Sequence, residues 1–340
     1  MTEWRPDALG EGWQCATLEL GRDEEGPLAA TLVRADPATA PTAAVPEGTR
    51  PPAARSPAVL YVHGYNDYFF QTHLARAWAE HGYTFYAIDL RRCGRSLRAW
   101  QTPHFTTDLR EYAADLDAAT RVLVEEQGHD RVVVNAHSTG GLTAALWLAD
   151  HGGDGAVQAL VLTSPWFDLN ADWFHRVVAT FALDRLPLDP RRVVDDRPSA
   201  YSWHLHADHG GRWTYDLALK PPEGFPVRAG WLRAIRRGQA RLAAGLDLRQ
   251  PVLVCTSAQS GPNTWDNPEL AAQDTILDVE QIAARAPRLG PDVTLVRIEG
   301  GVHDLSLSAP GPREEYLRVV FDWLAGQLDG QSSVTVPTTD

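Results

Sequence analysis

The chain is poor in cysteine, because only Cys15, Cys93 and Cys255 occur among its 340 residues. They lie far apart and form no Cys-x-x-Cys pair, so the sequence predicts neither a disulfide framework nor a cysteine-based metal site. Long apolar runs are also lacking, and no uninterrupted segment approaches the length of a membrane span. The polar start, residues 1–7, has no apolar signal core. We therefore expect a cytoplasmic protein without stable membrane insertion.

Basic residues are fewer than acidic ones, with 31 Lys and Arg against 44 Asp and Glu, which gives a net charge of −13. Such a surface repels phosphates, which argues against nucleic acids and anionic membranes as partners. A hydrophobic content of 44% and a charged content of 22% are ordinary for a globular protein. The length allows one large α/β domain with an insertion, or two domains.

Apolar runs alternate with segments of helical pattern along most of the chain. A short hairpin is expected from residues 15–20 and 28–34, followed by a Pro- and Ala-rich loop at 35–57. Strands are predicted at 58–62, 83–88, 131–135, 159–163, 252–256 and 293–298, and helices at 74–80, 107–126, 142–150, 279–286 and 314–328. This alternation implies an α/β fold with a mostly parallel central sheet, flanked by helices and joined by right-handed crossovers.

The alternation of strands and helices fails between residues 168 and 245. We interpret this segment as a helical cap inserted over the carboxyl edge of the sheet, where α/β enzymes bind ligands. A second structural layer without substrate contact is the alternative. The expected parts are a core at 1–167, the cap at 168–245, the rest of the core at 246–328 and a flexible tail at 329–340. Four tryptophans in or beside the cap are predicted to line a substrate pocket for an apolar acyl group: Trp166, Trp173, Trp203 and Trp231.

Ser138 lies where the predicted strand at 131–135 gives way to the predicted helix at 142–150. A serine at a strand-to-helix turn between small residues is the nucleophile-elbow pattern. The turn strains the serine backbone and lifts the hydroxyl above the sheet, so the residues two before and two after must be small. Ala136 and Gly140 meet that requirement. An ordinary serine in a turn is the alternative interpretation.

A nucleophilic serine needs a base, and His303 is the favoured candidate. It follows the last predicted strand in the segment Gly300-Gly301-Val302-His303, whose glycines let the loop bring an imidazole to the serine. Three other histidines, His204, His206 and His209, have a spacing that suggests a metal site. No clear set of carboxylates accompanies them, so we expect a solvated surface and no metal.

The acid that would orient the imidazole is harder to choose. No carboxylate follows the strand at 252–256 closely. Asp278 begins a capping box that ends at Gln281, which gives it a structural task. Asp274 precedes that box in a loop where an acid can face the histidine, and we choose it. Asp278 is the second candidate, and Asp168, after the preceding strand, is the third.

An oxyanion hole needs two backbone N–H groups that point at the developing negative charge. Thr139, the residue after the nucleophile, is expected to supply one from the helix start. Tyr65, in the loop 63–67 after the first buried strand, is expected to supply the other, because Gly64 permits a sharp turn.

Together these residues resemble the α/β-hydrolase superfamily, and within it the serine aminopeptidase-like branch that includes monoacylglycerol lipases and lysophospholipases. The resemblance covers roughly residues 15–328 and is carried by four segments: Val62-His63-Gly64-Tyr65, Asp89 to Ser96, Ala136 to Gly141, and Gly300 to His303. Three features depart from the family pattern: Ala136 and Arg92 each replace a glycine, and the loop before the acid is long.

The resemblance implies a serine hydrolase that cleaves a carboxylic ester, either a small ester or a monoacylglycerol- or lysophospholipid-like one, without a cofactor. Ser138 would attack, His303 would shuttle the proton, Asp274 would hold the imidazole, and the Tyr65 and Thr139 amides would hold the oxyanion. Acyl transfer and peptide or amide cleavage use the same machinery and stay open. A non-catalytic ligand-binding scaffold is the remaining alternative. Epoxide hydrolases and haloalkane dehalogenases do not fit, because their elbow nucleophile is Asp.

Overall fold

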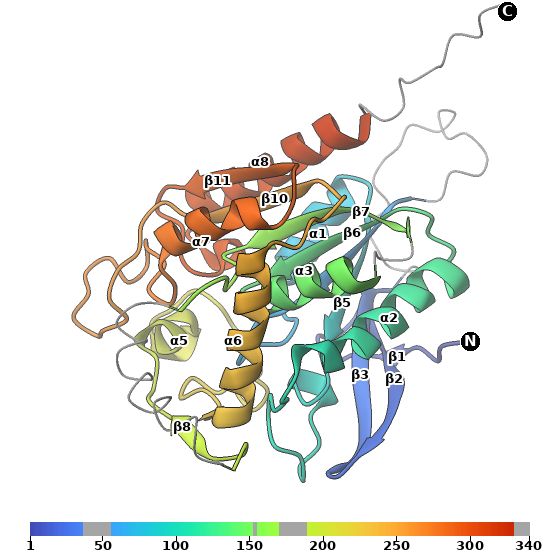
Figure 1. Ribbon diagram of the computed structural model, residues 1–340, viewed down its shortest axis with the longest axis horizontal. Helices are drawn as coiled ribbons and strands as arrows, with labels where there is room; N and C mark the ends of the chain where they lie inside the picture. The colour runs from blue at the N-terminus through green and yellow to red at the C-terminus, as the bar shows by residue number, and fades with distance from the viewer. Residues whose placement is uncertain (37–55, 152–154, 170–188, 330–340) are drawn as a thin grey trace, which may run out of the picture.

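The computed structural model describes residues 1–36, 56–151, 155–169 and 189–329. Its centre is a nine-stranded sheet in the order β1-β2-β3-β5-β4-β6-β7-β10-β11 (Figure 1). The strands are β1 Arg5–Pro6, β2 Trp13–Asp23, β3 Gly26–Ala35, β4 Ala58–Val62, β5 Thr84–Asp89, β6 Val132–His137, β7 Val157–Thr163, β10 Val252–Ser257 and β11 Val293–Ile298. The six strands from β5 to β11 in this order pair in parallel, while β1, β2 and β3 form an antiparallel edge. The mostly parallel sheet is as predicted.

The helices follow the predicted series closely. They are α1 Thr72–Glu80, α2 Ala113–Arg121, α3 Thr139–His151, α5 Ala200–Leu205, α6 Ala229–Ala244, α7 Val279–Arg285 and α8 Pro310–Asp329. The single helix expected at 107–126 is a 3-10 turn at 109–112, then α2, then a π-helical turn at 122–126. Two predicted segments, the loop at 35–57 and the tail at 329–340, fall almost wholly outside the described residues.

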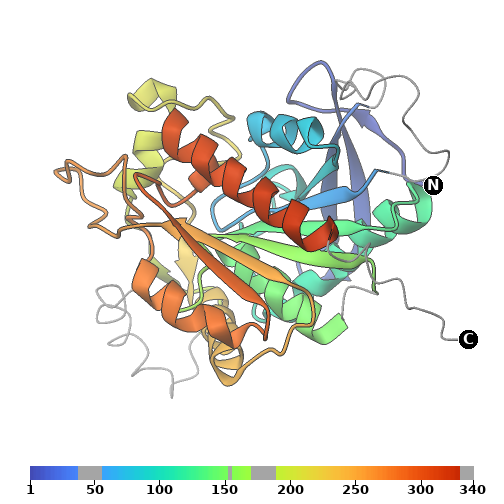
Figure 2. The same cartoon turned by 90° about the horizontal axis from the view of Figure 1, so that it is seen from above.

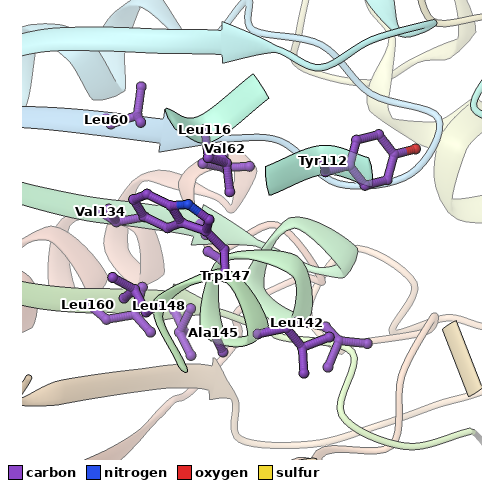
Figure 3. Close-up of a cluster of buried hydrophobic side chains, with 14 of the residues drawn as sticks. Leu60, Val62, Tyr112, Leu116, Val134, Leu142, Ala145, Trp147, Leu148 and Leu160 are labelled. Carbon is purple, nitrogen blue, oxygen red and sulfur yellow. The ribbon is translucent and has the colours of Figure 1, made fainter. Parts of the chain in front are cut away.

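Alternate residues of the strands pack on opposite faces of the sheet. In β4, Leu60 and Val62 join a buried cluster with side chains of α2, α3 and α6, while Tyr61 joins a second cluster with α1 and α8. Figure 2 shows α1 and α8 on one side of the sheet and α3 on the other. Figure 3 shows Val62 and Val134 of the sheet in one buried cluster with Leu142, Trp147 and Leu148 of α3. Because both faces are covered, β4, β6 and β10 are buried at every residue, whereas most residues of the edge strand β11 are half-buried or exposed.

The predicted cap segment divides into two parts by packing. Its end, α6, belongs to the helical layer of the core, because Trp231, Leu232 and Ile235 lie in the same buried cluster as α3. Residues 189–228 hold α5 and a two-stranded ribbon of β8 Val193–Asp195 and β9 Val227–Arg228. The cap therefore stays a prediction for residues 189–228, and residues 170–188 lie outside the described part. Among the described helices, none has both the length and the apolar character that crossing a membrane requires.

Candidate active site

Ser138 stands at the turn between β6 and α3 with a φ of +53°, in the left-handed region that non-glycine residues rarely adopt. Its amide donates to the Thr163 carbonyl at 3.0 Å, which holds the turn against the end of β7. A Cβ on Gly140 would lie 2.3 Å from the backbone oxygen of His63, so glycine is needed there. Ala136 is fully buried and fits with its methyl group. The predicted strand, serine and helix are thus in place around a strained serine.

The imidazole of His303 bridges Ser138 and Asp274. Its Nε2 lies 3.0 Å from Ser138 Oγ, and its Nδ1 lies 2.9 Å from Asp274 Oδ2. Because an ionised carboxylate only accepts, Nδ1–H donates to Asp274, which leaves Nε2 free to accept from the serine hydroxyl. All three side chains are at most 7% exposed. The structure thus brings together the three residues predicted as nucleophile, base and acid.

The long loop after β10 folds back so that Asp274 lies beside the residues that directly follow the strand. The Asp274 amide donates to the Gln259 carbonyl at 2.9 Å, and the Gly261 amide donates to the Asp274 carbonyl at 3.0 Å. The carboxylate is fixed as well, since its Oδ1 accepts from the amides of Ile276 and Leu277 at 2.9 and 2.8 Å. The acid is therefore close to the strand end in space although it is distant in sequence.

The two other candidate acids have different partners. Asp278 accepts from the Glu280 amide at 2.9 Å and caps α7, as predicted. The capping box is incomplete, because Gln281 Oε1 accepts no hydrogen bond from the Asp278 amide. Asp168 binds Arg285 through its Oδ2 at 2.7 Å. Neither carboxylate contacts His303 in the structure.

The loop after β4 passes directly against the nucleophile. A Cβ on Gly64 would lie 3.0 Å from the Ser138 Cβ. His63 fixes this loop, because its Nε2 accepts from the Leu90 amide at 3.1 Å and its Nδ1 therefore donates to the Gly64 carbonyl at 2.7 Å. Tyr65 follows, and Thr139 is the first residue of α3. Both line the same cavity as Ser138, where the oxyanion donors are expected.

A cavity of about 880 Å³ opens above Ser138 and His303. Trp166 and Trp231 line it, together with Tyr201 and Phe225 from the predicted cap segment. Trp203 does not line it, and its indole packs on His209 and on Trp265 with ring centroids 4.3 and 6.1 Å apart. Trp173 lies outside the described residues. Two of the four tryptophans predicted to bind substrate therefore reach the cavity.

Known proteins share this architecture. Residues 53–204 match the family model described as serine aminopeptidase, S33. The crystal structure of a monoacylglycerol lipase from Paleococcus ferrophilus has a TM-score of 0.60 and 19% identity, and the alignment covers 80% of this chain and 96% of that chain. The chain therefore has the α/β-hydrolase fold, and residues 53–204 are similar to the serine aminopeptidase family.

Further structures with this fold are similar to the chain over nearly its whole length. A soluble variant of monoglyceride lipase from Saccharomyces cerevisiae, solved with a substrate analogue, has a TM-score of 0.62 and 14% identity over 96% of this chain and 94% of that chain. A putative aryl esterase from Burkholderia cenocepacia has a TM-score of 0.53 and 17% identity over 92% and 99%. No curated protein sequence matches the chain significantly.

A group of charged side chains on the wall of this cavity was missed by the sequence analysis. Asp67, His137, Lys220 and Asp304 all line the cavity and are each at most 7% exposed. Burial lowers the pKa of His137, so its ring is neutral near pH 7. For Asp304, burial raises the pKa, but the neighbouring His137, Ser306 and Lys220 outweigh it and hold the pKa below the usual value. One signal was available, because Lys220 is the only lysine in the sequence.

Within the part of the chain that the structure describes, one group of three possible metal ligands lies together. A ring nitrogen of His137 and one oxygen each of Asp67 and Asp304 are within 4.8 Å of one another. The Lys220 ammonium lies 2.7 Å from Asp67 Oδ1 and supplies positive charge to this group. The histidines at 204, 206 and 209, whose spacing suggested a metal, do not form such a group.

Proposed function

We propose that this protein is an α/β-hydrolase that cleaves carboxylic esters through an acyl-enzyme on Ser138. The observation that carries the proposal is the continuous contact from Ser138 Oγ through His303 to Asp274, at 3.0 and 2.9 Å, with the serine at the edge of a cavity. The similar structures named as monoacylglycerol lipase, monoglyceride lipase and putative aryl esterase support ester substrates. We keep the cytoplasm as the predicted location.

The geometry suits the following sequence of steps. His303 Nε2 accepts the proton of Ser138 as Oγ attacks the ester carbonyl, and the imidazolium is stabilised by Asp274. The Tyr65 and Thr139 amides hold the oxyanion of the tetrahedral intermediate. His303 then returns the proton to the leaving alcohol, and the ester C–O bond breaks. Water repeats these steps on the acyl-enzyme and releases the acid. This mechanism uses no metal and no organic cofactor.

The cavity wall suggests the class of ester. Trp166, Trp231 and Phe225 provide apolar surface for an acyl chain. A small ester or a monoacylglycerol- or lysophospholipid-like ester with an apolar acyl group is therefore our proposed substrate. Residues 189–228, which contribute Tyr201 and Phe225, are proposed to act as the cap that shapes this wall.

Peptide or amide cleavage is a second candidate, favoured by the match of residues 53–204 to the serine aminopeptidase model. The same three residues would act, with an amine in place of the alcohol as the leaving group. Acyl transfer to an alcohol or amine would follow if an acceptor other than water entered the cavity.

A panel of p-nitrophenyl esters and matched p-nitroanilides tests these proposals. We expect the wild-type protein to release nitrophenol faster than nitroaniline, and the Ser138→Ala variant to lose both activities. Ser56→Ala serves as a control, because that hydroxyl forms a hydrogen bond with Thr84 and neither residue lines the cavity. Full turnover in Ser138→Ala would contradict the acyl-enzyme, and a preference for anilides would favour the peptidase. A non-catalytic scaffold would turn over neither class.

A further inference from the structure

Several side chains of the loop that carries Tyr65 form hydrogen bonds with one distant segment, residues 216–226, here called the strap. The Tyr65 hydroxyl donates to the Phe225 carbonyl at 3.1 Å. Asn66 Oδ1 accepts from the Phe225 amide at 3.2 Å. The Tyr68 hydroxyl accepts from the amide at the start of the strap at 2.8 Å. Bonds to backbone groups fix the two segments relative to each other.

Asp67, between Asn66 and Tyr68, makes the charged contact of this series. Its Oδ1 lies 2.7 Å from Lys220 Nζ in the strap. The two residues are only 2% and 7% exposed. A buried ion pair of this kind resists separation, because either partner alone would leave an uncompensated charge away from water.

The surroundings of Lys220 suit an ammonium group. Its Nζ lies 5.1 Å from the ring centre of Phe70 and 5.5 Å from that of Tyr215, within cation–π distance of both. A lysine ammonium is a compact charge, whereas an arginine guanidinium is a wide planar fork. The chain has 30 arginines and a single lysine, and that lysine occupies this position. The compact ammonium of Lys220 thus contacts Asp67 and both rings at once.

The ion pair lies two residues from the proposed oxyanion donor. Gly64 of this loop is already packed against the nucleophile, because a Cβ added to it would lie 3.0 Å from the Ser138 Cβ. A small shift of this loop would move the Tyr65 amide relative to the reacting carbonyl, and displacements of about 1 Å at such sites reduce rates by up to about 10²-fold. We propose that Lys220 is a positioning residue, which holds the Tyr65 amide in the oxyanion hole by binding Asp67. This proposal rests on the proposed ester hydrolysis.

The test compares Lys220→Met and Lys220→Arg with the wild-type protein. We expect kcat for a p-nitrophenyl ester to fall about 10- to 100-fold in Lys220→Met, with KM changed less than about twofold, since an oxyanion donor acts on the transition state. The rate of fluorophosphonate labelling at Ser138 should fall by the same factor, because the phosphoryl oxygen occupies the same hole. Lys220→Arg keeps the positive charge but replaces the compact ammonium with a wider guanidinium. Its kcat should lie between the values of the wild-type protein and Lys220→Met.

Arg91→Met is the matched control, because Arg91 forms another buried ion pair, with Asp115, away from the cavity. It should lower the melting temperature and leave kcat and the labelling rate of the folded fraction unchanged. A double-mutant cycle gives the mechanism: Asp67→Asn combined with Lys220→Met should reduce kcat no further than Lys220→Met alone. Additive losses would overturn a role through Asp67.

Three further results would overturn the proposal. The first is a folded Lys220→Met with wild-type kcat and labelling rate. The second is a rise in KM without a fall in kcat, which would make Lys220 a substrate-binding residue. If Lys220→Met does not fold, Asp67→Asn replaces it, because this variant removes the charge that Lys220 binds. Unchanged kcat and labelling in Asp67→Asn would be the third result. The proposed function is tested separately, by ester turnover and Ser138 labelling in the wild-type protein. The labelling rate reports on the position of the Tyr65 amide even when the natural substrate is not known.

Discussion

The two ends of the Ser138–His303–Asp274 arrangement are held in different ways. Ser138 is positioned mainly by its neighbours in sequence, β6 and α3, and in addition its amide donates to the Thr163 carbonyl at the end of β7. Asp274 is fixed by a loop that returns to the end of β10 and pairs with residues 259 and 261. The elbow is thus a local structure, whereas the acid depends on long-range backbone pairing. The same difference decides which changes should damage the site most.

Asp274→Asn should give the largest effect at the loop end. Without the carboxylate, the imidazole loses the partner that fixes its tautomer, and turnover should fall roughly 10⁴-fold in a folded protein. Asp278→Asn is the matched control, since Asn also caps helices well and turnover should stay near the wild-type value. Ester kinetics and circular dichroism of both variants provide the measurement. If the two variants behave the other way round, the acid is Asp278, and if neither loses activity the candidate becomes Asp168.

Gly140→Ala tests the elbow end. The new Cβ would lie 2.3 Å from the backbone oxygen of His63, so the turn must shift. We expect a loss of about 1–3 kcal/mol in the free energy of unfolding and a fall in turnover of up to about 10²-fold as Ser138 moves. Gly326→Ala is the control, because nothing lies within 4 Å of its Cβ position in α8, where alanine should stabilise the helix slightly. Equal behaviour of the two variants in denaturant titrations and ester assays would contradict the tight elbow.

Acidic pH should weaken the loop that carries Tyr65. His104 packs on Tyr65 and Phe225 with ring centroids 4.9 and 5.1 Å apart, and burial lowers the pKa of His104 from 6.5 to about 3. Between these pH values the unfolded chain binds a proton that the folded chain does not. The free energy of unfolding therefore decreases as the pH is lowered, by about 2 kcal/mol at pH 5 relative to neutral pH. His104→Asn tolerates the residue's φ of +52° and should show a shallower fall between pH 7 and 5 in denaturant titrations. An unchanged slope would exclude His104 as the source.

Trp166→Ala should give the smallest effect, a change in acyl preference. Removing the indole lengthens the cavity, so the preferred acyl chain should become longer, with up to about fourfold gain per added methylene until the space is filled. Trp203→Ala is the control, because Trp203 does not line the cavity. Rates over a series of p-nitrophenyl esters provide the measurement. The same chain-length profile in both variants would place acyl selection elsewhere.

Much of the fold was predictable because its signals are local. The strand at 293–298 agrees with β11 residue for residue, and the apolar run at 132–134 lies in β6. The elbow was predictable for the same reason, since its strand, serine and helix are contiguous. Asp274 could be ranked first among the carboxylates only because Asp278 has an evident capping task.

The rest depends on contacts that sequence separation conceals. Asp67 and Lys220 are 153 residues apart, and no pattern around either residue indicates that they pair. Trp203 was expected to line the pocket with the other tryptophans, yet it packs on His209 and Trp265 instead, because composition says nothing about the direction in which α5 turns a side chain. The position of α6 in the core layer follows likewise from its packing on α3.

Mass spectrometry of the protein after reaction with a fluorophosphonate tests the arrangement of Ser138, His303 and Asp274 as one chemical unit. We expect a single adduct, located on Ser138, whose formation is greatly slowed in His303→Ala and in Asp274→Asn and unchanged in Asp278→Asn. An adduct on another residue, or labelling of Ser138 at the wild-type rate in His303→Ala, would contradict the account.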